Sequence, residues 1–208
     1  LACAYTLLPE AARNLVTPVL FSLSLLAAVQ PAWAQDAASL LAETRKTALP
    51  VLPKVVQAMQ TAVKEQGPVG AIPVCKEKAP QLLQEMRQQT GWDIRRVSLK
   101  TRNPATGTPD AWEARQLADF DIKAANGAKP EQIEVGEIIT ASDGKRSYRY
   151  MKALPVAEVC LTCHGPSDLL ADDLKAALSK DYPLDRATGY AVGEVRGALT
   201  VTRPLLGP

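Results

Sequence analysis

Hydrophobic residues recur with helical spacing in two segments of the N-terminal half. The first covers residues 36–65, where Pro50 and Pro53 should kink or split the helix because each proline removes a backbone donor. The second begins near Pro73 and covers residues 73–89. Its apolar face carries Ile72, Cys75, Ala79, Leu82 and Met86. The pattern therefore predicts two or three N-terminal helices, with Cys75 directed at the core.

Farther along the chain, the hydrophobic period shortens to two, as in strands buried on one side. Asp110 is expected to cap a further helix, and Ser142-Asp143-Gly144 to form a hairpin turn. Strands are predicted over 92–99, 133–140, 146–151 and 194–202, helices over 111–125 and 167–180, and a loop over 101–109. Helices followed by a mostly antiparallel sheet indicate an α+β fold of one domain.

Residues 1–34 are predicted to form a cleaved signal peptide. An apolar run over 16–29 follows the basic Arg13, and Ala32-Trp33-Ala34 has the A-x-A pattern that signal peptidase cuts. The run is short for a membrane span, although an uncleaved anchor is the alternative. The expected mature domain, 35–208, is exported to the periplasm and contacts the membrane only if that anchor is retained.

Composition narrows the classes of partner. The 208 residues are 47% hydrophobic and 22% charged, with a net charge of +2, which suits one globular domain. No long basic run or acidic tail is present, and aromatic residues make up only 5%. These features argue against a nucleic-acid partner, because binding would require a cationic surface or a stacking platform.

Cys160-Leu161-Thr162-Cys163-His164 matches the C-x-x-C-H pattern of c-type haem attachment. Two thiols one helical turn apart suit the two vinyl groups on one porphyrin edge, and the adjacent histidine suits the iron. Together with an export signal, the motif predicts one covalent haem c held by Cys160 and Cys163, with His164 as an iron ligand.

Three other readings of this motif compete. In an oxidising compartment, Cys160 and Cys163 can form a disulfide. A thioredoxin-type C-x-x-C is also possible, but that motif belongs to a βαβ setting that this sequence lacks. A zinc site would need Cys75 together with Cys160, Cys163 and His164. Because Cys163 and His164 are adjacent, they cannot easily occupy two corners of one tetrahedron.

The second axial position cannot be filled by a histidine of this chain, because the chain contains one histidine and the motif uses it. It is left to methionine, cysteine, lysine, a small molecule, or no ligand. Cys75 is the leading candidate, since the first turn of a helix and the nearby Lys76 and Lys78 favour a thiolate. A free cysteine is also commonly a small buried hydrophobic residue. The alternative sulfur ligands are Met59, Met86 and Met151.

Several stretches resemble a family of exported c-type haem domains with a PAS-like fold, found alone or as the input domains of sensor kinases. They are AIPVCKEKAP (71–80), TGWDIRRVSLKTRNP (90–104), DAWE (110–113), CLTCHG (160–165) and DYPLDRATGYAVGEVRGALTV (181–201). The resemblance implies a haem on a PAS-like antiparallel sheet with N-terminal helices. It also implies His164 and Cys75 as axial ligands.

Other pocket residues are suggested by chemistry alone. Arg102 belongs to a basic cluster with Arg95, Arg96 and Lys100, and an arginine is a natural partner for a haem propionate, although a solvated surface is the commoner place for such a run. Trp112 and Tyr150 are candidates to pack on the porphyrin, although ordinary core positions also suit them.

These features predict a monohaem protein that transfers single electrons or senses redox state, with a redox or signalling protein as its partner. A haem-based gas or redox sensor that signals to a partner is the alternative function. An enzymatic role such as peroxidase is disfavoured, because no second histidine is present to act as a distal acid–base group.

Overall fold

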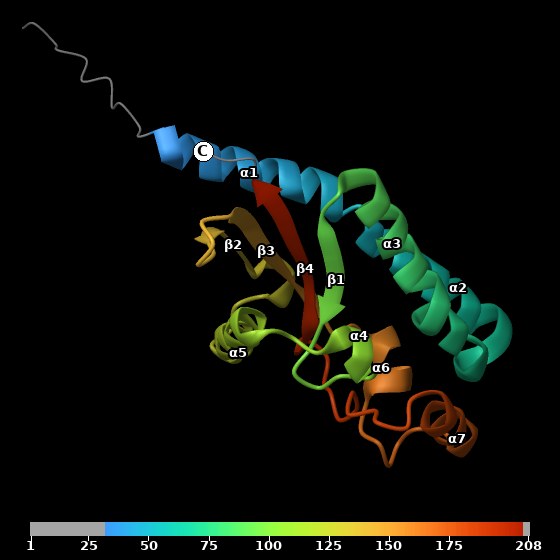
Figure 1. Cartoon of the computed structure of the whole chain (residues 1–208). Coiled ribbons are helices and arrows are strands. Elements are labelled where there is room, and N and C mark those ends of the chain that lie inside the picture. The colour runs from blue at the N-terminus through green and yellow to red at the C-terminus, as the bar shows by residue number, and fades with distance from the viewer. Residues whose placement is uncertain (1–31, 206–208) are drawn as a thin grey trace, which may run out of the picture. The chain divides into compact units, whose positions relative to one another are not determined.

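Residues 32–205 of the chain, as described by a computed structural model, form helices around an antiparallel sheet (Figure 1). The predicted signal peptide, 1–34, lies almost wholly outside these residues. Among the described helices, none is both long enough and apolar enough to span a membrane. The predicted α+β class is confirmed, and the antiparallel sheet is consistent with a PAS-like arrangement.

The N-terminal helices break where the prolines and a glycine require it. The turn at Leu49-Pro50 separates the first two helices, as predicted, and Gly67 in the second adopts φ 73°, which a helix does not allow. The elements are α1 (Ala32–Ala48), α2 (Val51–Gly70), the π-helical turn η1 (Val74–Lys78) and α3 (Ala79–Thr90). The single helix expected over 73–89 is thus wrong in its first part, which is a π-turn.

The sheet contains four antiparallel strands in the order β1-β4-β3-β2. Their bounds are β1 (Asp93–Val97), β2 (Glu134–Thr140), β3 (Arg146–Pro155) and β4 (Val195–Leu205). Both β3 and β4 extend beyond the predicted strands. The shared register shifts between Leu154 and Pro155, because Leu154 pairs with Gly197 whereas Pro155 pairs with Val195. Arg196 is therefore the extra residue of a β-bulge.

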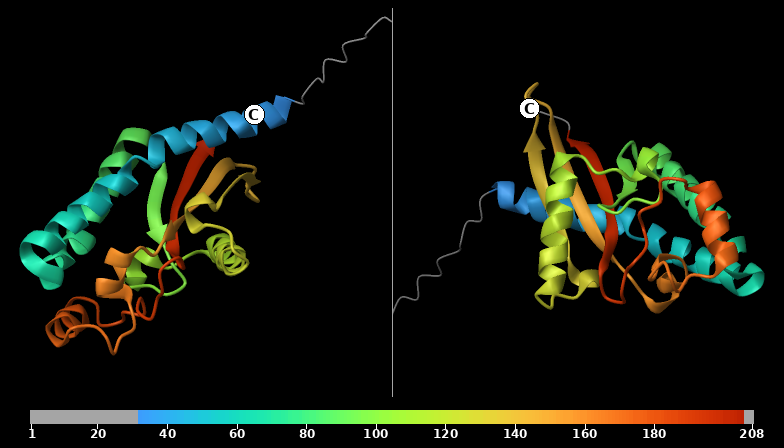
Figure 2. Two further views of the ribbon diagram at one scale, coloured as in Figure 1. Left: turned by 180° about the vertical axis from the view of Figure 1, so that it is seen from behind. Right: turned by 90° about the horizontal axis from the view of Figure 1, so that it is seen from below.

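The two faces of the sheet bury separate hydrophobic clusters, as the views in Figure 2 help to follow. On one face, Ile94, Tyr150 and Leu199 pack with residues of α1, α2 and α3. On the other, Met151 and Ala198 pack with residues of α5 (Ala111–Ala125). The sheet thus forms the middle layer between N-terminal helices and α5.

A third, smaller cluster lies beyond the end of the sheet. Leu174 and Leu178 of α7 pack with Ile72, which follows α2, and Cys163 contacts the same cluster. The remaining short elements are α4 (Pro104–Gly107), η2 (Pro130–Gln132), α6 (Glu158–His164) and α7 (Asp172–Asp181). The predicted loop at 101–109 contains α4, and α7 begins later than the expected residue 167. This cluster brings α6 close to the chain between α2 and η1.

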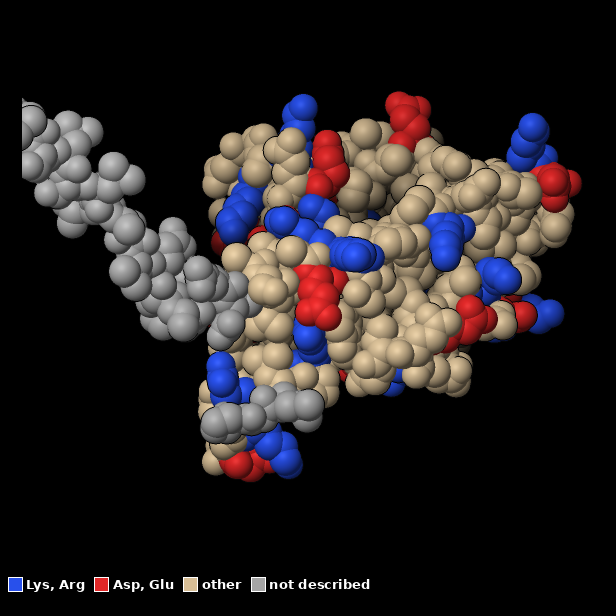
Figure 3. Space-filling model, turned by 90° about the horizontal axis from the view of Figure 1, so that it is seen from above, with Lys and Arg blue, Asp and Glu red and all other residues tan. Residues whose placement is uncertain are grey.

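The face seen from above carries acidic and basic side chains mixed together (Figure 3). Two pairs tie α1 to the sheet: Arg45 binds Glu134 of β2, and Glu43 accepts from Arg203 of β4 at 2.7 Å. Charged side chains therefore dock α1 in addition to its apolar contacts.

Candidate functional site

A cavity of about 560 Å³ opens beside β1, one of the two edge strands of the sheet. This volume is in the range of small-molecule and cofactor pockets. Its walls come from η1, α3, the segment after β1, the end of α6 and the bulge of β4. Cys75, Arg102 and His164 all line it, so three residues chosen from separate parts of the sequence face one space.

Cys75 lies on the π-helical turn and is exposed toward this cavity, so the prediction that it points into the core is wrong. The cause is local. The Ala79 N–H bonds to the Val74 carbonyl five residues back, and Pro80 has no N–H to restore the regular ladder. The wider turn changes the direction of Cys75 from the one that a regular helix gives. Single π-turns inside helices frequently occur at functional sites.

The C-x-x-C-H segment forms the short helix α6, in which Cys160 and Cys163 are one turn apart. Both are partly buried free thiols, so the structure contains no disulfide between them. They flank the cavity without belonging to its lining, whereas His164 at the end of α6 belongs to it. Burial raises the pKa of the Cys163 thiol, an effect that the nearby Arg102 opposes.

The imidazole of His164 is oriented by the loop before β4. Its Nδ1 lies 2.6 Å from the carbonyl oxygen of Ala187, and Nε of Arg196 lies 3.3 Å from the same nitrogen. One nitrogen cannot donate to the carbonyl and also accept from arginine, and the shorter contact assigns the proton to Nδ1. Nε2, which bonds to no described residue, then keeps its lone pair, as in histidines that ligate metals.

The environment of His164 also keeps the ring neutral. Burial lowers its pKa well below the ordinary histidine value, and the charges of Arg196 and Arg102 lower it further. A neutral imidazole is the form that binds a metal. The ring of Tyr190 lies edge-on to that of His164, with the ring centres 6.3 Å apart.

Arg102 connects the loop before β4, which contains Asp185 and Ala187, to α6. Its Nε donates to Asp185 at 3.0 Å, and its other end donates to the Cys163 carbonyl. Asp185 in turn accepts from the Ala187 N–H at 2.8 Å, which places the Ala187 carbonyl against His164. Arg102 therefore lines the cavity and is engaged by a carboxylate of the protein itself. Its contact with a propionate stays a prediction.

Two important residues were missed by the sequence reasoning. Arg196 lines the cavity from the β4 bulge, and the available signal was the glycine that follows it inside a strand. Gly197 has φ 149°, and a Cβ there would lie 2.3 Å from the Val97 carbonyl oxygen, so β1 and β4 approach closely only with glycine at this position.

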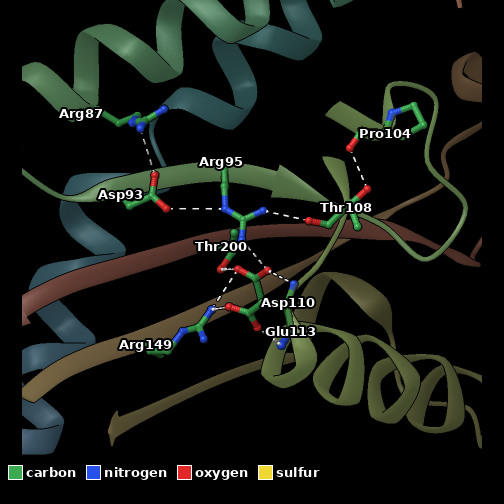
Figure 4. A network of polar contacts seen from close by, with 9 residues as sticks. All are labelled: Arg87, Asp93, Arg95, Pro104, Thr108, Asp110, Glu113, Arg149 and Thr200. Carbon is green, nitrogen blue, oxygen red and sulfur yellow. Dashed lines mark hydrogen bonds and ion pairs between the residues drawn. The ribbon is translucent and has the colours of Figure 1, made fainter. Parts of the chain in front are cut away.

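Glu113 is the other missed residue, and it anchors the wall behind the cavity (Figure 4). Its buried carboxylate accepts from Arg95 of β1 at 2.6 Å, Arg149 of β3 at 3.0 Å and Thr200 of β4 at 2.8 Å. It also completes a capping box with Asp110, of which the sequence analysis recognised only the aspartate. One carboxylate thus joins α5 to three strands.

The structure gives no support to the alternative haem contacts, the methionine ligands or the zinc site that the sequence left open. Trp112 and Tyr150 occupy the two core clusters, as ordinary core residues would. None of Met59, Met86 and Met151 belongs to the lining of the cavity. Within residues 32–205, no three His, Cys, Asp or Glu side chains lie close enough together to hold a metal ion, so the four zinc candidates are not gathered as a tetrahedral site requires.

The sheet, its helical layers and this cavity define an α+β domain with a ligand pocket at one sheet edge, bordered by sulfur, imidazole and guanidinium groups. The family model of the Tll0287-like proteins (Tll0287) matches residues 32–204, and the chain belongs to this family. A comparison with curated proteins gives no match.

A solved structure has the same fold. It is the crystal structure of the cyanobacterial haem protein Tll0287, which is 21% identical, with a TM-score of 0.56. The match covers 86% of this chain and 99% of that one. At this identity, the likeness establishes the shared fold.

Proposed function

We propose that this protein binds one haem c covalently through Cys160 and Cys163, with His164 and Cys75 as axial ligands. The observation that carries the proposal is that Cys75 and His164 line one cavity although they come from distant segments. Membership of the Tll0287-like family, and the fold shared with a haem protein of that name, support it.

The donor set fits this group. α6 offers two free thiols one turn apart, followed by an imidazole whose Nδ1 is bonded to a carbonyl and whose Nε2 is left for a metal. Apolar residues of the lining, including Leu83, Ile94 and Val97, suit a porphyrin, and its arginines suit carboxylates. Bound there, a haem supplies one-electron redox chemistry.

The proposed role is one-electron transfer or redox sensing in the periplasm, with a protein as redox or signalling partner and without catalytic turnover of a substrate. The chain holds the cofactor, fixes the ring of His164 and encloses it among the sheet edge, η1 and α6. A thiolate from Cys75 would stabilise the ferric state and give a potential below that of His/Met cytochromes.

A haem-based gas sensor is the second candidate, and the π-turn favours it. Cys75 is exposed on a short irregular turn, so its release from a ligand would leave the core clusters intact. Carbon monoxide separates the two roles. A reduced protein whose spectrum is unchanged by the gas supports electron transfer, whereas ready binding supports gas sensing.

The mass of the exported protein tests the proposal. In a host with cytochrome c maturation, the purified chain should be heavier than its polypeptide by one haem, and acid–acetone should not extract the colour. The double variant Cys160→Ser/Cys163→Ser should lose the covalent group, whereas Cys75→Ser should keep it. A colourless wild-type protein from this host contradicts the proposal.

A further inference from the structure

Arg196 is a buried cation without an acidic partner in the described part of the chain. The residue is 9% exposed, and one terminal nitrogen of its side chain donates to the Ser98 hydroxyl at 3.0 Å and to the Lys100 carbonyl at 3.2 Å. These acceptors are neutral. Two other arginines of the lining do have an acidic partner, because Arg95 binds Glu113 and Arg102 binds Asp185.

Such an arrangement is costly in an otherwise complete fold. A buried charge without an opposite charge loses hydration that neutral hydrogen-bond partners replace only in part. Burial, and then the charge of Arg96, lower the pKa of Arg196 to about 10. The charge of Arg102 adds to this effect, whereas Tyr190 and Asp185 oppose it. No salt bridge of Arg96 occurs among residues 32–205 either, and Arg96 lines the same cavity.

A β-bulge in the backbone directs the side chain of Arg196 into the cavity. Arg196 is the bulged residue of β4, and bulges redirect a side chain from the alternation of a strand. Gly197 permits the close contact with β1 that accompanies the bulge. The ring of Tyr190 supports the guanidinium, 5.4 Å from its centre. The side chain is thus held in place before any ligand is present.

We propose that Arg196 is the carboxylate-binding residue of the cavity and that it sets the electrostatic potential at His164, with Arg96 as the second cation at this wall. The inference rests on the proposed function, in which the carboxylates are the propionates of the haem. It places the anion on a buried guanidinium that forms no ion pair among the described residues and that contacts Nδ1 of His164, the proposed iron ligand.

Replacement of the charge tests this role. In haem-loaded protein, Arg196→Gln should favour the ferric form at least tenfold, a fall in potential of about 59 mV for a one-electron couple. The propionate bending band in the resonance Raman spectrum should shift as well. Arg203→Gln is the matched control, since it removes a cation from the same strand where Arg203 binds Glu43, and it should change neither quantity.

Arg196→Lys keeps the charge but loses the planar fork. Its reduction equilibrium should stay within about threefold of wild type, by the same conversion, while the propionate band shifts. This variant carries the test if Arg196→Gln does not accumulate.

A haem-loaded Arg196→Gln with wild-type potential and band overturns the inference alone, as does an unshifted band in Arg196→Lys. A wild-type chain that carries no haem overturns the proposed function instead, and the two failures are told apart by mass.

Discussion

At the scale of single residues, the buried carboxylate of Glu113 is the most connected group in the structure. Each of its two oxygens accepts a hydrogen bond from an arginine, and the carboxylate also accepts from the Asp110 N–H and the Thr200 hydroxyl. Because Arg95 reaches it from the strand that borders the cavity, this carboxylate also fixes one wall of the pocket. A residue far from the C-x-x-C-H motif therefore affects the shape of the site.

Replacing Glu113 should be strongly destabilising. Glu113→Gln removes the buried counter-charge that Arg95 and Arg149 share and leaves them paired only with the more exposed Asp93 and Asp110. Loss of a charged hydrogen-bond partner in a buried position costs about 1–3 kcal/mol. Urea denaturation should show this fall in the free energy of unfolding. Asp119→Asn, on the same helix in an exposed pair with Lys123, should change it by only about 0.5 kcal/mol or less. Equal effects of the two substitutions would refute the role given to Glu113.

Cys75 can be tested by its effect on the iron. Cys75→Ser should remove the thiolate signature from the ferric EPR spectrum and favour the ferrous form at least tenfold, about 59 mV in potential, because thiolate stabilises the ferric state. Haem should stay attached, since Cys160 and Cys163 are unchanged. Met59→Leu, at a partly buried position outside the cavity, should match wild type. An unchanged spectrum in Cys75→Ser rules this ligand out.

At the scale of elements, α1 depends on a polar contact with the sheet. Glu134 of β2 accepts from Arg45 of α1 at 3.0 Å and from the Tyr150 hydroxyl of β3 at 2.6 Å. Burial acts to raise the pKa of Glu134, but these hydrogen bonds outweigh it, so its pKa lies below the ordinary glutamate value. The ionised carboxylate is therefore the form that holds α1.

This shift gives a pH dependence with a definite sign. A carboxyl whose pKa is lower in the folded than in the unfolded state stabilises the fold above the unfolded value, about 4.3 for glutamate, and this contribution is lost as the pH falls through the folded pKa. Stability measured from pH 6 downward should therefore decline less steeply in Glu134→Gln than in wild type. Parallel acid profiles of the two proteins would contradict the assignment.

Elements were predictable where a local signal decides the backbone. Asp110 marked the start of α5, and Pro50 marked the break between α1 and α2, because capping and proline act within one turn. The π-turn at Cys75 and the bulge at Arg196 were not predicted. The bulge depends on the pairing of β4 with β3, and the π-turn depends on one backbone hydrogen bond just before Pro80. Hydrophobic periodicity reports neither. The motif residues of the site were accessible to sequence reasoning, whereas their orienting partners Ala187 and Arg196 were not.

At the scale of the whole molecule, the site is assembled from three regions that are far apart in sequence. Cys75 lies between α2 and α3, His164 ends α6, and Arg196 belongs to the last strand. The small cluster of α7 with Ile72 and Cys163, and the ion pair of Lys76 with Asp181, hold the first region against α6 and α7. Packing outside the motif therefore determines whether the proposed ligands meet.

The separation of Cys75 from α6 has a consequence for the unfolded chain. If iron joins Cys75 to a haem tethered at Cys160, it closes a covalent ring of about 85 residues. In a disulfide of that span, the lost freedom of the unfolded polymer is equivalent to about 4–5 kcal/mol. The tethers to Cys160 and Cys163 alone close a loop of only a few residues, which constrains the unfolded chain very little. The same sulfur–iron bond would then act as a reversible cross-link. Its release on a change of oxidation state would raise the conformational entropy of the unfolded chain and so lower the melting temperature.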